Sequence, residues 1–304
     1  MYSGANACGA CGGDDFEPPV RLRELMYASG ETFDYLRCRD CGCLQIAAFP
    51  DDMARHYPDD YYSFGALNQS LRDRVRDWLT LNGPARLFGE QPWYRRGGWR
   101  SLDGIARTAR IVDVGCGDGS FICRLRQLGF AHVCGIDAFI EGDRVLPGGV
   151  PVYRKTIENL DDTFDVVMMH HSLEHMPDQL GVLAKARDVF SDGGRLIVRI
   201  PVVDSWAAEE FGKDWAHLDP PRHFFLHTRK SISALVERAG LALDRVVDEW
   251  SEFGVRGSLL ARSGKPSIST DPLDGPELEV ALADQRRASA QSRSDTIAVH
   301  AHRP

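Results

Sequence analysis

Five cysteines lie within the first 43 residues, and four of them form two CxxCG units: Cys8 with Cys11, and Cys38 with Cys41. Two residues between thiolates allow both sulfurs to reach one tetrahedral Zn²⁺, and the following glycine allows a tight turn that directs backbone N–H groups at sulfur. Four thiolates leave no open coordination position, so we expect a structural ion. The alternative is a set of unpaired thiols. We expect Cys43 to be buried without binding the ion.

The segment between the two units has 26 residues, against roughly 15–20 in most such sites. It holds two candidate strands, 27–29 and 32–36. We therefore interpret residues 1–48 as a small zinc-binding module that resembles a zinc ribbon.

A glycine-rich turn over 112–119 follows a short apolar run and precedes a segment with helical spacing. Gly115 allows a sharp turn, Gly117 leaves room for a ligand on the backbone, and Gly119 allows close packing at the helix start. Nicotinamide enzymes favour GxGxxG, with a pyrophosphate on the helix N-terminus. Here the spacing is GxGxG, and Asp113 precedes it. That carboxylate repels a pyrophosphate and attracts the ammonium group of a cofactor that carries an amino acid.

A second carboxylate, Asp137, ends the next predicted strand, 24 residues after Asp113. At this position it can accept hydrogen bonds from both hydroxyls of a ribose. Ile157 follows the third predicted strand and is expected on an adenine face, with Glu158 near the exocyclic amine. Cys116, between the glycines, is expected to fill space beside the cofactor and not to act as a nucleophile.

Two groups of histidines are candidates for acid–base chemistry. One follows the strand predicted at 164–169, and the other lies in the segment 202–228, which is rich in Trp, Phe and Pro: His170, His171 and His175, then His217, His223 and His227. Ligands of parallel α/β sheets bind at the carboxyl ends of the strands, so both groups should converge over the cofactor. We expect His175 or His223 to be the general base, with the other orienting the acceptor, and His171 beside them.

The acceptor pocket is expected to include His217, Arg222 and Trp215. Arg222 offers a two-point grip on a phosphate or carboxylate. The face of Trp215 suits a sugar, with simple packing as the alternative. Glu174 is interpreted as a carboxylate favoured at a helix start.

Alternating strands and helices from residue 110 onward indicate βαβ units around a parallel sheet. We predict four segments in chain order: 1–48 zinc module, 49–107 connector with a helix at 67–81, 108–262 cofactor-binding domain with an acceptor-site insertion at 202–228, and 263–304 polar tail. Strands are expected at 242–249 and 256–262. The tail is expected to be partly disordered, with one helix at 276–290.

These motifs, VDVGCGDGSF, GIDA, FDVVMMHHSLEHMPD and SDGGRLIVRIP, resemble the class I S-adenosylmethionine-dependent methyltransferases over residues 105–262. The resemblance implies a Rossmann-like α/β fold with seven strands in the order 3-2-1-4-5-7-6, strand 7 being antiparallel. It also implies that Asp113, the glycine loop and Asp137 with Ala138 hold the cofactor, and that His170 faces its methionine part. The alternatives are a Rossmann-like domain that binds NAD or no ligand.

The CxxC head, the segment HYPDDYYSF and the run DWAHLDPPRHFFLHT resemble bacterial methyltransferases found with surface-polysaccharide and natural-product sugar genes. This resemblance implies methyl transfer to a sugar or nucleotide sugar. Because zinc ribbons often bind nucleic acid, a tRNA or rRNA methyltransferase is the alternative, and a non-catalytic cofactor-binding protein is a third.

The net charge of −8 argues against a nucleic-acid partner, which normally meets a basic face. We expect no signal peptide, because no long apolar stretch follows a charged start, and no membrane span, because no apolar run reaches about 18–20 residues. Paired CxxC units without secretion signals favour a reducing cytoplasm. The sequence leaves the oligomeric state open.

Overall fold

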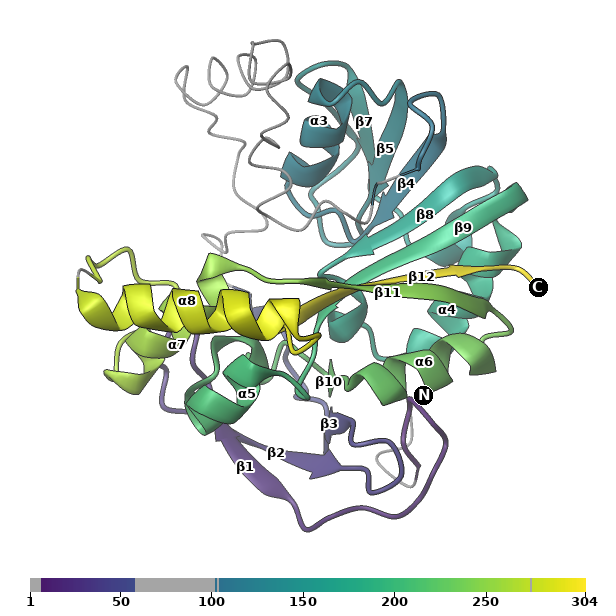
Figure 1. The fold of residues 1–304 in the computed structure, drawn as a ribbon. Coiled ribbons are helices and arrows are strands. Elements are labelled where there is room, and N and C mark those ends of the chain that lie inside the picture. Colours follow the sequence, from purple (N-terminus) through teal and green to yellow (C-terminus); the bar gives the residue numbers. More distant parts are fainter. Residues whose placement is uncertain (1–6, 58–101, 103, 274) are drawn as a thin grey trace.

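The fold comes from a computed structural model, which describes residues 7–57, 102, 104–273 and 275–304 (Figure 1). The helix predicted at 67–81, and most of the connector 49–107, lie outside the described residues.

An eight-stranded sheet forms the centre, in the order β11-β12-β9-β8-β4-β5-β7-β6. The strands are β4 (Arg110–Val114), β5 (His132–Ile136), β6 (Arg144–Leu146), β7 (Val150–Tyr153), β8 (Phe164–His170), β9 (Phe190–Pro201), β11 (Ala242–Glu249) and β12 (Thr296–His302). The five strands β7, β5, β4, β8 and β9 are adjacent in that order and pair in parallel. Strand β12 pairs antiparallel with both β9 and β11. The predicted order 3-2-1-4-5-7-6 is therefore confirmed. An edge strand that the sequence did not predict, β6, pairs antiparallel with β7.

Helices cover the sheet and close the crossovers (Figure 1). They are α3 (Ser120–Gln127), α4 (Gln179–Asp188), α5 (Trp206–Phe211), α6 (Arg229–Arg238), α7 (Glu252–Arg262) and α8 (Pro276–Ala290). Helix α3 packs on β5 and β7, α4 on β9, and α6 on β11. The side chain of Thr228 caps α6 and that of Asp178 caps α4, which accounts for where these helices begin.

The prediction of a partly disordered tail over 263–304 is wrong. Its last residues form β12, in which Ile297, Val299 and Ala301 are fully buried between β9 and β11. The Ser, Pro and Asp residues of 263–275 led us to interpret everything after them as a polar tail. The strand β12 near its end is stabilised by two neighbours that are distant in sequence. The helix at 276–290 is confirmed as α8.

The strand predicted at 256–262 is also wrong, because this segment belongs to α7. Ser251 caps the helix by accepting a hydrogen bond from the Gly254 backbone, and Val255 and Leu259 are buried at helical spacing. The seventh strand of the sheet is thus β12 and not residues 256–262.

The N-terminal residues form an antiparallel sheet of β1 (Val20–Arg23), β2 (Thr32–Arg37) and β3 (Leu44–Ile46), to which β10 (Phe225–Leu226) adds. The strand predicted at 32–36 is confirmed as β2, and residues 27–29 form no strand. Since β10 comes from the predicted acceptor-site insertion, the module and the insertion share one sheet. The Tyr35 hydroxyl, fully buried, donates to the carbonyl of His223 at 2.7 Å. The boundary predicted at residue 48 therefore does not separate two independently packed units.

Candidate active site

The glycine loop follows β4 and is packed too closely for side chains. Gly115 has φ +75°, and a Cβ there would lie 2.6 Å from the Cβ of Ser172. Gly119 has φ +77°, and its Cβ would lie 2.2 Å from a methyl group of Leu146. Ser172 also donates to the Val114 carbonyl at 2.6 Å. The loop after β8 thus packs directly on the glycine loop. The close contacts at both positions leave no room for a side chain, so both positions require glycine.

Asp113 is a buried carboxylate at the end of β4, with 1% of its surface exposed. It accepts the backbone N–H of His170, and burial raises its pKa well above the usual value. Its Oδ1 has no hydrogen-bond partner among the described residues. A buried carboxylate with an unused oxygen is suited to a cationic or N–H group of a ligand.

Asp137 holds the glycine loop from the end of β5. Its carboxylate accepts the backbone N–H of Gly117 at 3.0 Å and that of Phe139 at 2.8 Å. Arg144 donates to the Gly117 carbonyl at 3.0 Å. Each carboxylate oxygen keeps a second lone pair, so the arrangement remains compatible with a ribose diol.

The predicted adenine contacts differ in exposure. Ile157 is 2% exposed and belongs to the core, Glu158 is exposed, and Ala138 is half-buried. The apolar side chain exposed beside Asp137 is Phe139, at 83%. The sequence analysis did not single out this residue, although it is an aromatic side chain two positions after the carboxylate expected to bind a ribose. Cys116 is buried, and burial raises the pKa of its thiol, which agrees with a space-filling role.

His170 and His171 end β8 as predicted, and both are held by Arg199 from β9. The His170 ring stacks on Phe121 of α3, with 3.9 Å between ring centroids. The pKa of His170 lies well below its usual value because of burial and then Arg199.

His171 does not present a free base. Arg199 Nη1 donates to His171 Nε2 at 2.6 Å, which places the proton on Nδ1. That Nδ1 lies 3.4 Å from Glu174 Oε1, and Arg199 Nε donates to Glu249. The expected catalytic use of His171 therefore conflicts with its hydrogen bonds. Arg199 and Glu249 were missed, although an arginine inside the apolar run RLIVRIP was a signal.

His175 and His223 lie together, their rings edge to face at 4.7 Å. His175 Nδ1 lies 2.9 Å from the Arg222 carbonyl, and His223 Nδ1 lies 2.8 Å from the His217 carbonyl. Since a carbonyl only accepts, both Nδ1 atoms carry protons and both Nε2 atoms keep a lone pair. Burial lowers the pKa of both histidines, that of His175 to about 4, with His223 adding to the effect.

Arg222 is not available to an acceptor, contrary to the prediction. Its side chain is 1% exposed and donates to Asp219, to Glu24 of the N-terminal sheet, and to the His56 carbonyl. Glu24 is 198 positions away in the chain, so no local pattern announced this pair. Arg222 therefore joins the segment that carries His223 to the N-terminal sheet.

Trp215 and His217 are also more enclosed than predicted. Trp215 is fully buried and packs edge to face on His217 at 5.6 Å, so its face is not open to a sugar. His217 is 7% exposed, and its Nε2 lies 3.4 Å from the Ser251 hydroxyl and 3.8 Å from Asp295. Burial, followed by His171 and Arg199, lowers the pKa of His217 to about 3.

The four predicted cysteines converge. Cys8 Sγ lies 3.6 Å from Cys41 Sγ, and Cys11 Sγ lies 3.6 Å from Cys38 Sγ. A tetrahedral zinc with Zn–S bonds of about 2.3 Å requires S···S distances of about 3.8 Å. The backbone N–H of Gly13 points at Cys11 Sγ at 3.4 Å. The donor set and spacing therefore fit a zinc ion, and Cys43 is buried outside the group.

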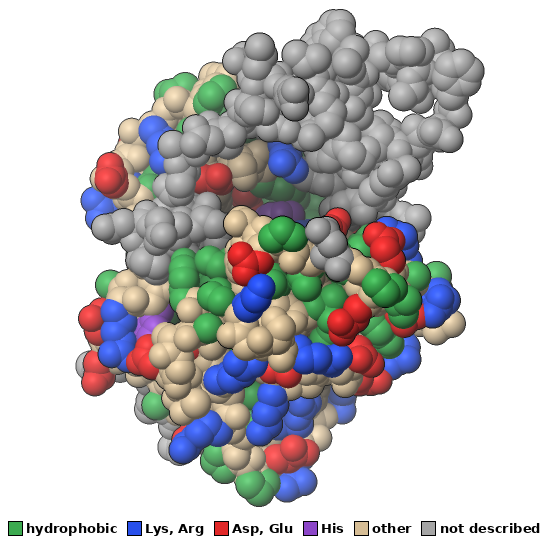
Figure 2. Space-filling model, turned by 90° about the vertical axis from the view of Figure 1, so that its left-hand side faces the viewer, with side chains coloured by type: hydrophobic (Ala, Val, Ile, Leu, Met, Phe, Trp, Pro, Cys, Tyr) green, Lys and Arg blue, Asp and Glu red, His purple; other side chains and the backbone are tan. Residues whose placement is uncertain are grey.

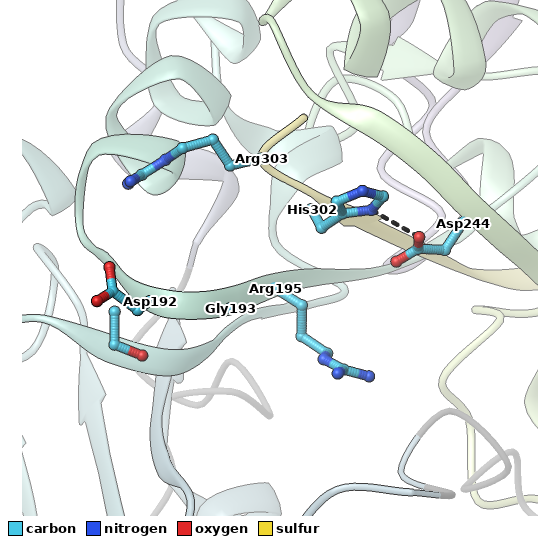
Figure 3. A pocket seen from close by; sticks show the side chains of 8 residues that line it. Asp192, Gly193, Arg195, Asp244, His302 and Arg303 are labelled. Carbon is cyan, nitrogen blue, oxygen red and sulfur yellow. Dashed lines mark ion pairs between the residues drawn. The ribbon is translucent and has the colours of Figure 1, made fainter.

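A separate pocket of about 460 Å³ lies beside the amino end of β9, away from the glycine loop (Figure 3). It is lined by Ser191, Asp192, Arg195, Asp244, His302 and Arg303. The Asp244–His302 ion pair spans part of it at 2.6 Å. It adjoins the amino end of β9, whereas ligands of parallel sheets bind at the carboxyl ends. Among the described residues, no helix is long and apolar enough to cross a membrane.

Comparison with known proteins gives a consistent family. A model described as a methyltransferase domain matches residues 72–246. The ubiquinone biosynthesis O-methyltransferase of Paramagnetospirillum magneticum is 31% identical over 253 residues, covering 69% of this chain and 98% of that protein. The tRNA U34 carboxymethyltransferase of Pseudomonas aeruginosa is 24% identical over 221 residues, covering 67% and 69%. A solved S-adenosylmethionine-dependent methyltransferase from Thermotoga maritima aligns with TM-score 0.43 and 16% identity, covering 75% of this chain and 100% of that one.

Proposed function

The chain belongs to the methyltransferase-domain family and is an S-adenosylmethionine-dependent methyltransferase, and on that premise we propose that it methylates a hydroxyl of a small, sugar-like acceptor lying against His175 and His223. The observation that carries the proposal is that His175 and His223 lie together and that each keeps a lone pair on Nε2. The segment that carries His175 packs on the glycine loop. The cytoplasm, where the cysteines stay reduced, is the proposed compartment.

The cofactor would be held by the residues around the ends of β4 and β5. Asp113 is suited to its ammonium group, directly or through water, and Asp137 to its ribose. Phe139 offers an exposed ring for the adenine. When bound, S-adenosylmethionine supplies an electrophilic methyl group on a sulfonium. The aspartates orient it, and neither needs to exchange a proton during transfer.

On the acceptor side, His175 or His223 would take the hydroxyl proton at Nε2, so that the acceptor oxygen could accept the methyl group that the cofactor supplies, with S-adenosylhomocysteine as the leaving group. The backbone carbonyls of Arg222 and His217 fix both rings in the tautomer needed for this step. Ser172, three residues before His175, touches the glycine loop. The base is therefore carried by a segment anchored to the cofactor loop, which provides the alignment that in-line displacement requires.

The cysteine group would hold one structural zinc ion at Cys8, Cys11, Cys38 and Cys41. Thr228, which caps α6, donates to the Cys41 carbonyl at 2.6 Å, and β3 pairs with β10. The ion would thus stabilise the sheet against which His223 is held.

A small acceptor is supported by the charge distribution and by the resemblance to sugar-modifying methyltransferases. On the face in Figure 2, the Arg and Lys side chains of the described residues are interspersed with Asp and Glu. A second candidate is an RNA acceptor, favoured by the relatives named as tRNA U34 carboxymethyltransferases and by the cysteine module.

The test is release of S-adenosylhomocysteine by zinc-loaded protein given S-adenosylmethionine with sugars and nucleotide sugars, or with unmodified tRNA and rRNA. We expect release with a sugar, reduced about 100-fold or more in His175→Gln or His223→Gln. The variant His132→Gln, at the exposed amino end of β5, is the control and should match the wild type. Release with RNA alone would replace the sugar assignment with the second candidate.

A further inference from the structure

Glu174, His175 and His223 form a second group of metal-ligating side chains, separate from the cysteines. One ligand atom from each lies within 4.8 Å of the others. Glu174 and His175 come from the short 3-10 helix Leu173–His175 after β8, and His223 comes from the segment before β10. Two segments 48 residues apart therefore supply the group.

Both imidazoles are already in the tautomer that a metal needs. Each donates its Nδ1 hydrogen to a backbone carbonyl, at 2.9 Å for His175 and 2.8 Å for His223, and keeps its Nε2 lone pair. Metal-bound histidines are usually oriented by such a bond from their second nitrogen. The hydroxyl of Tyr57 also lies 3.4 Å from His175 Nδ1, on the side away from Nε2.

Glu174 provides the independent observation. Its side chain is 1% exposed, and neither carboxylate oxygen has a hydrogen-bond partner among the described residues. The neutral imidazole of His171 directs its protonated Nδ1 toward Oε1 from 3.4 Å, beyond a well-formed hydrogen bond, and supplies no charge. The neighbouring carboxylate, Asp219, lies 3.9 Å from His223 Nε2 but is already paired with Arg222. A buried carboxylate without a hydrogen bond is costly unless a cation or donor compensates it.

We propose that Glu174, His175 and His223 bind a divalent transition-metal ion of the zinc class. Two imidazoles and one carboxylate form a donor set that zinc and other first-row ions use at catalytic sites, where a further position stays open. Bonds of about 2.0–2.1 Å require ligand atoms about 3.3 Å apart, so binding draws the three side chains together. A magnesium ion, which prefers oxygen ligands, does not fit this set.

An ion at this position deepens the proposed function, because it would take the Nε2 lone pairs of both proposed bases. It would lower the pKa of an acceptor hydroxyl at its open position, whose proton would pass to water, and the histidines would then act on the acceptor only as ligands of the ion. This consequence rests on the proposed function, whereas the metal site does not.

The test uses the full chain carrying one Zn²⁺ at the cysteines, titrated with Co²⁺ alone and without cofactor or acceptor. We expect one further equivalent to bind and to give visible d–d absorption without new sulfur-to-cobalt charge-transfer bands. Glu174→Gln and His223→Gln should each lose that binding, and His132→Gln should keep it. Co²⁺ should also raise the Tm of the wild type and not that of the two variants.

X-ray absorption at the cobalt edge keeps the test decisive if a variant fails to fold. We expect imidazole and oxygen scattering with no sulfur. Absence of binding to folded wild type, sulfur ligands, or unchanged binding in both folded variants would overturn the site. Because no turnover is measured, loss of this site leaves methyl transfer standing, and failure of every acceptor leaves the site standing.

Discussion

Replacing Arg222 by methionine should destabilise the protein strongly, because it leaves two carboxylates buried without a cation. The side chains of Arg222, Glu24 and Asp219 are 1%, 2% and 5% exposed. Removing one partner from a buried ion pair costs about 3–5 kcal/mol. Glu24→Gln keeps the Arg222–Asp219 pair. Because both Glu24 oxygens also accept backbone N–H groups of Tyr27 and Ser29, it loses at least one charged hydrogen bond, at about 1.5–3 kcal/mol each.

The triple variant Arg222→Met, Glu24→Gln, Asp219→Asn supplies the matched control. It carries no buried charge at this position, so it should be more stable than Arg222→Met alone, although it has more substitutions. The guanidinium also holds the pKa of Asp219 below its usual value despite burial. Stability from a lowered carboxyl pKa is present above the unfolded value of about 3.9 and is lost as pH falls through the folded value. The difference between wild type and Arg222→Met should therefore narrow below about pH 4.

Urea unfolding of the four proteins at pH 7 and at pH 3–4 measures these quantities. A loss under about 1 kcal/mol in Arg222→Met, or a triple variant less stable than the single one, would refute the buried-pair reasoning. An acceptor-gripping role for Arg222 predicts a different result, namely a raised KM with unchanged stability.

Three further predictions concern the C-terminal strand, a buried acid and the cysteines. Val299→Asp, which puts a charge between β9 and β11, should abolish cooperative unfolding followed by circular dichroism, whereas a disordered tail would tolerate it. Burial raises the pKa of Asp295 to about 7 from 3.8, so wild type should lose up to about 4 kcal/mol relative to Asp295→Asn as pH rises from 4 to 7 in urea unfolding, and a constant difference would contradict this. Mercurial release of the zinc ion proposed at the cysteines should lower the Tm by about 5 °C or more, and an unchanged Tm would contradict a structural role for such an ion.

The arrangement of the residues proposed to hold the cofactor was predictable because its signals are local. Asp113, the glycine spacing and Asp137 sit within short stretches whose chemistry depends on strand ends and turns, and the sheet order follows from the family they resemble. The four cysteines were equally readable from their spacing. In each case the residues that act together are announced by a repeated or compact pattern.

The acceptor side depends on pairs that are distant in sequence. Nothing near Arg222 indicates that Glu24 occupies its guanidinium, and nothing near His223 indicates that a carbonyl fixes its tautomer. The strand β12 was missed for the same reason, since its burial comes from β9 and β11 and not from its own neighbours in sequence. Local patterns predict which side chains gather at a site. Contacts between residues distant in sequence decide which of those side chains are available to a ligand.

Equilibrium dialysis of labelled S-adenosylmethionine tests the central claim most directly, because it needs no knowledge of the acceptor. The account predicts saturable binding by the wild type, weakened about 10–100-fold in Asp137→Ala through the loss of charged hydrogen bonds. Asp192→Ala, in the pocket beside the amino end of β9, should bind S-adenosylmethionine as the wild type does. No binding by folded wild type, or equal binding by Asp137→Ala, would contradict the assignment of this loop as the cofactor site.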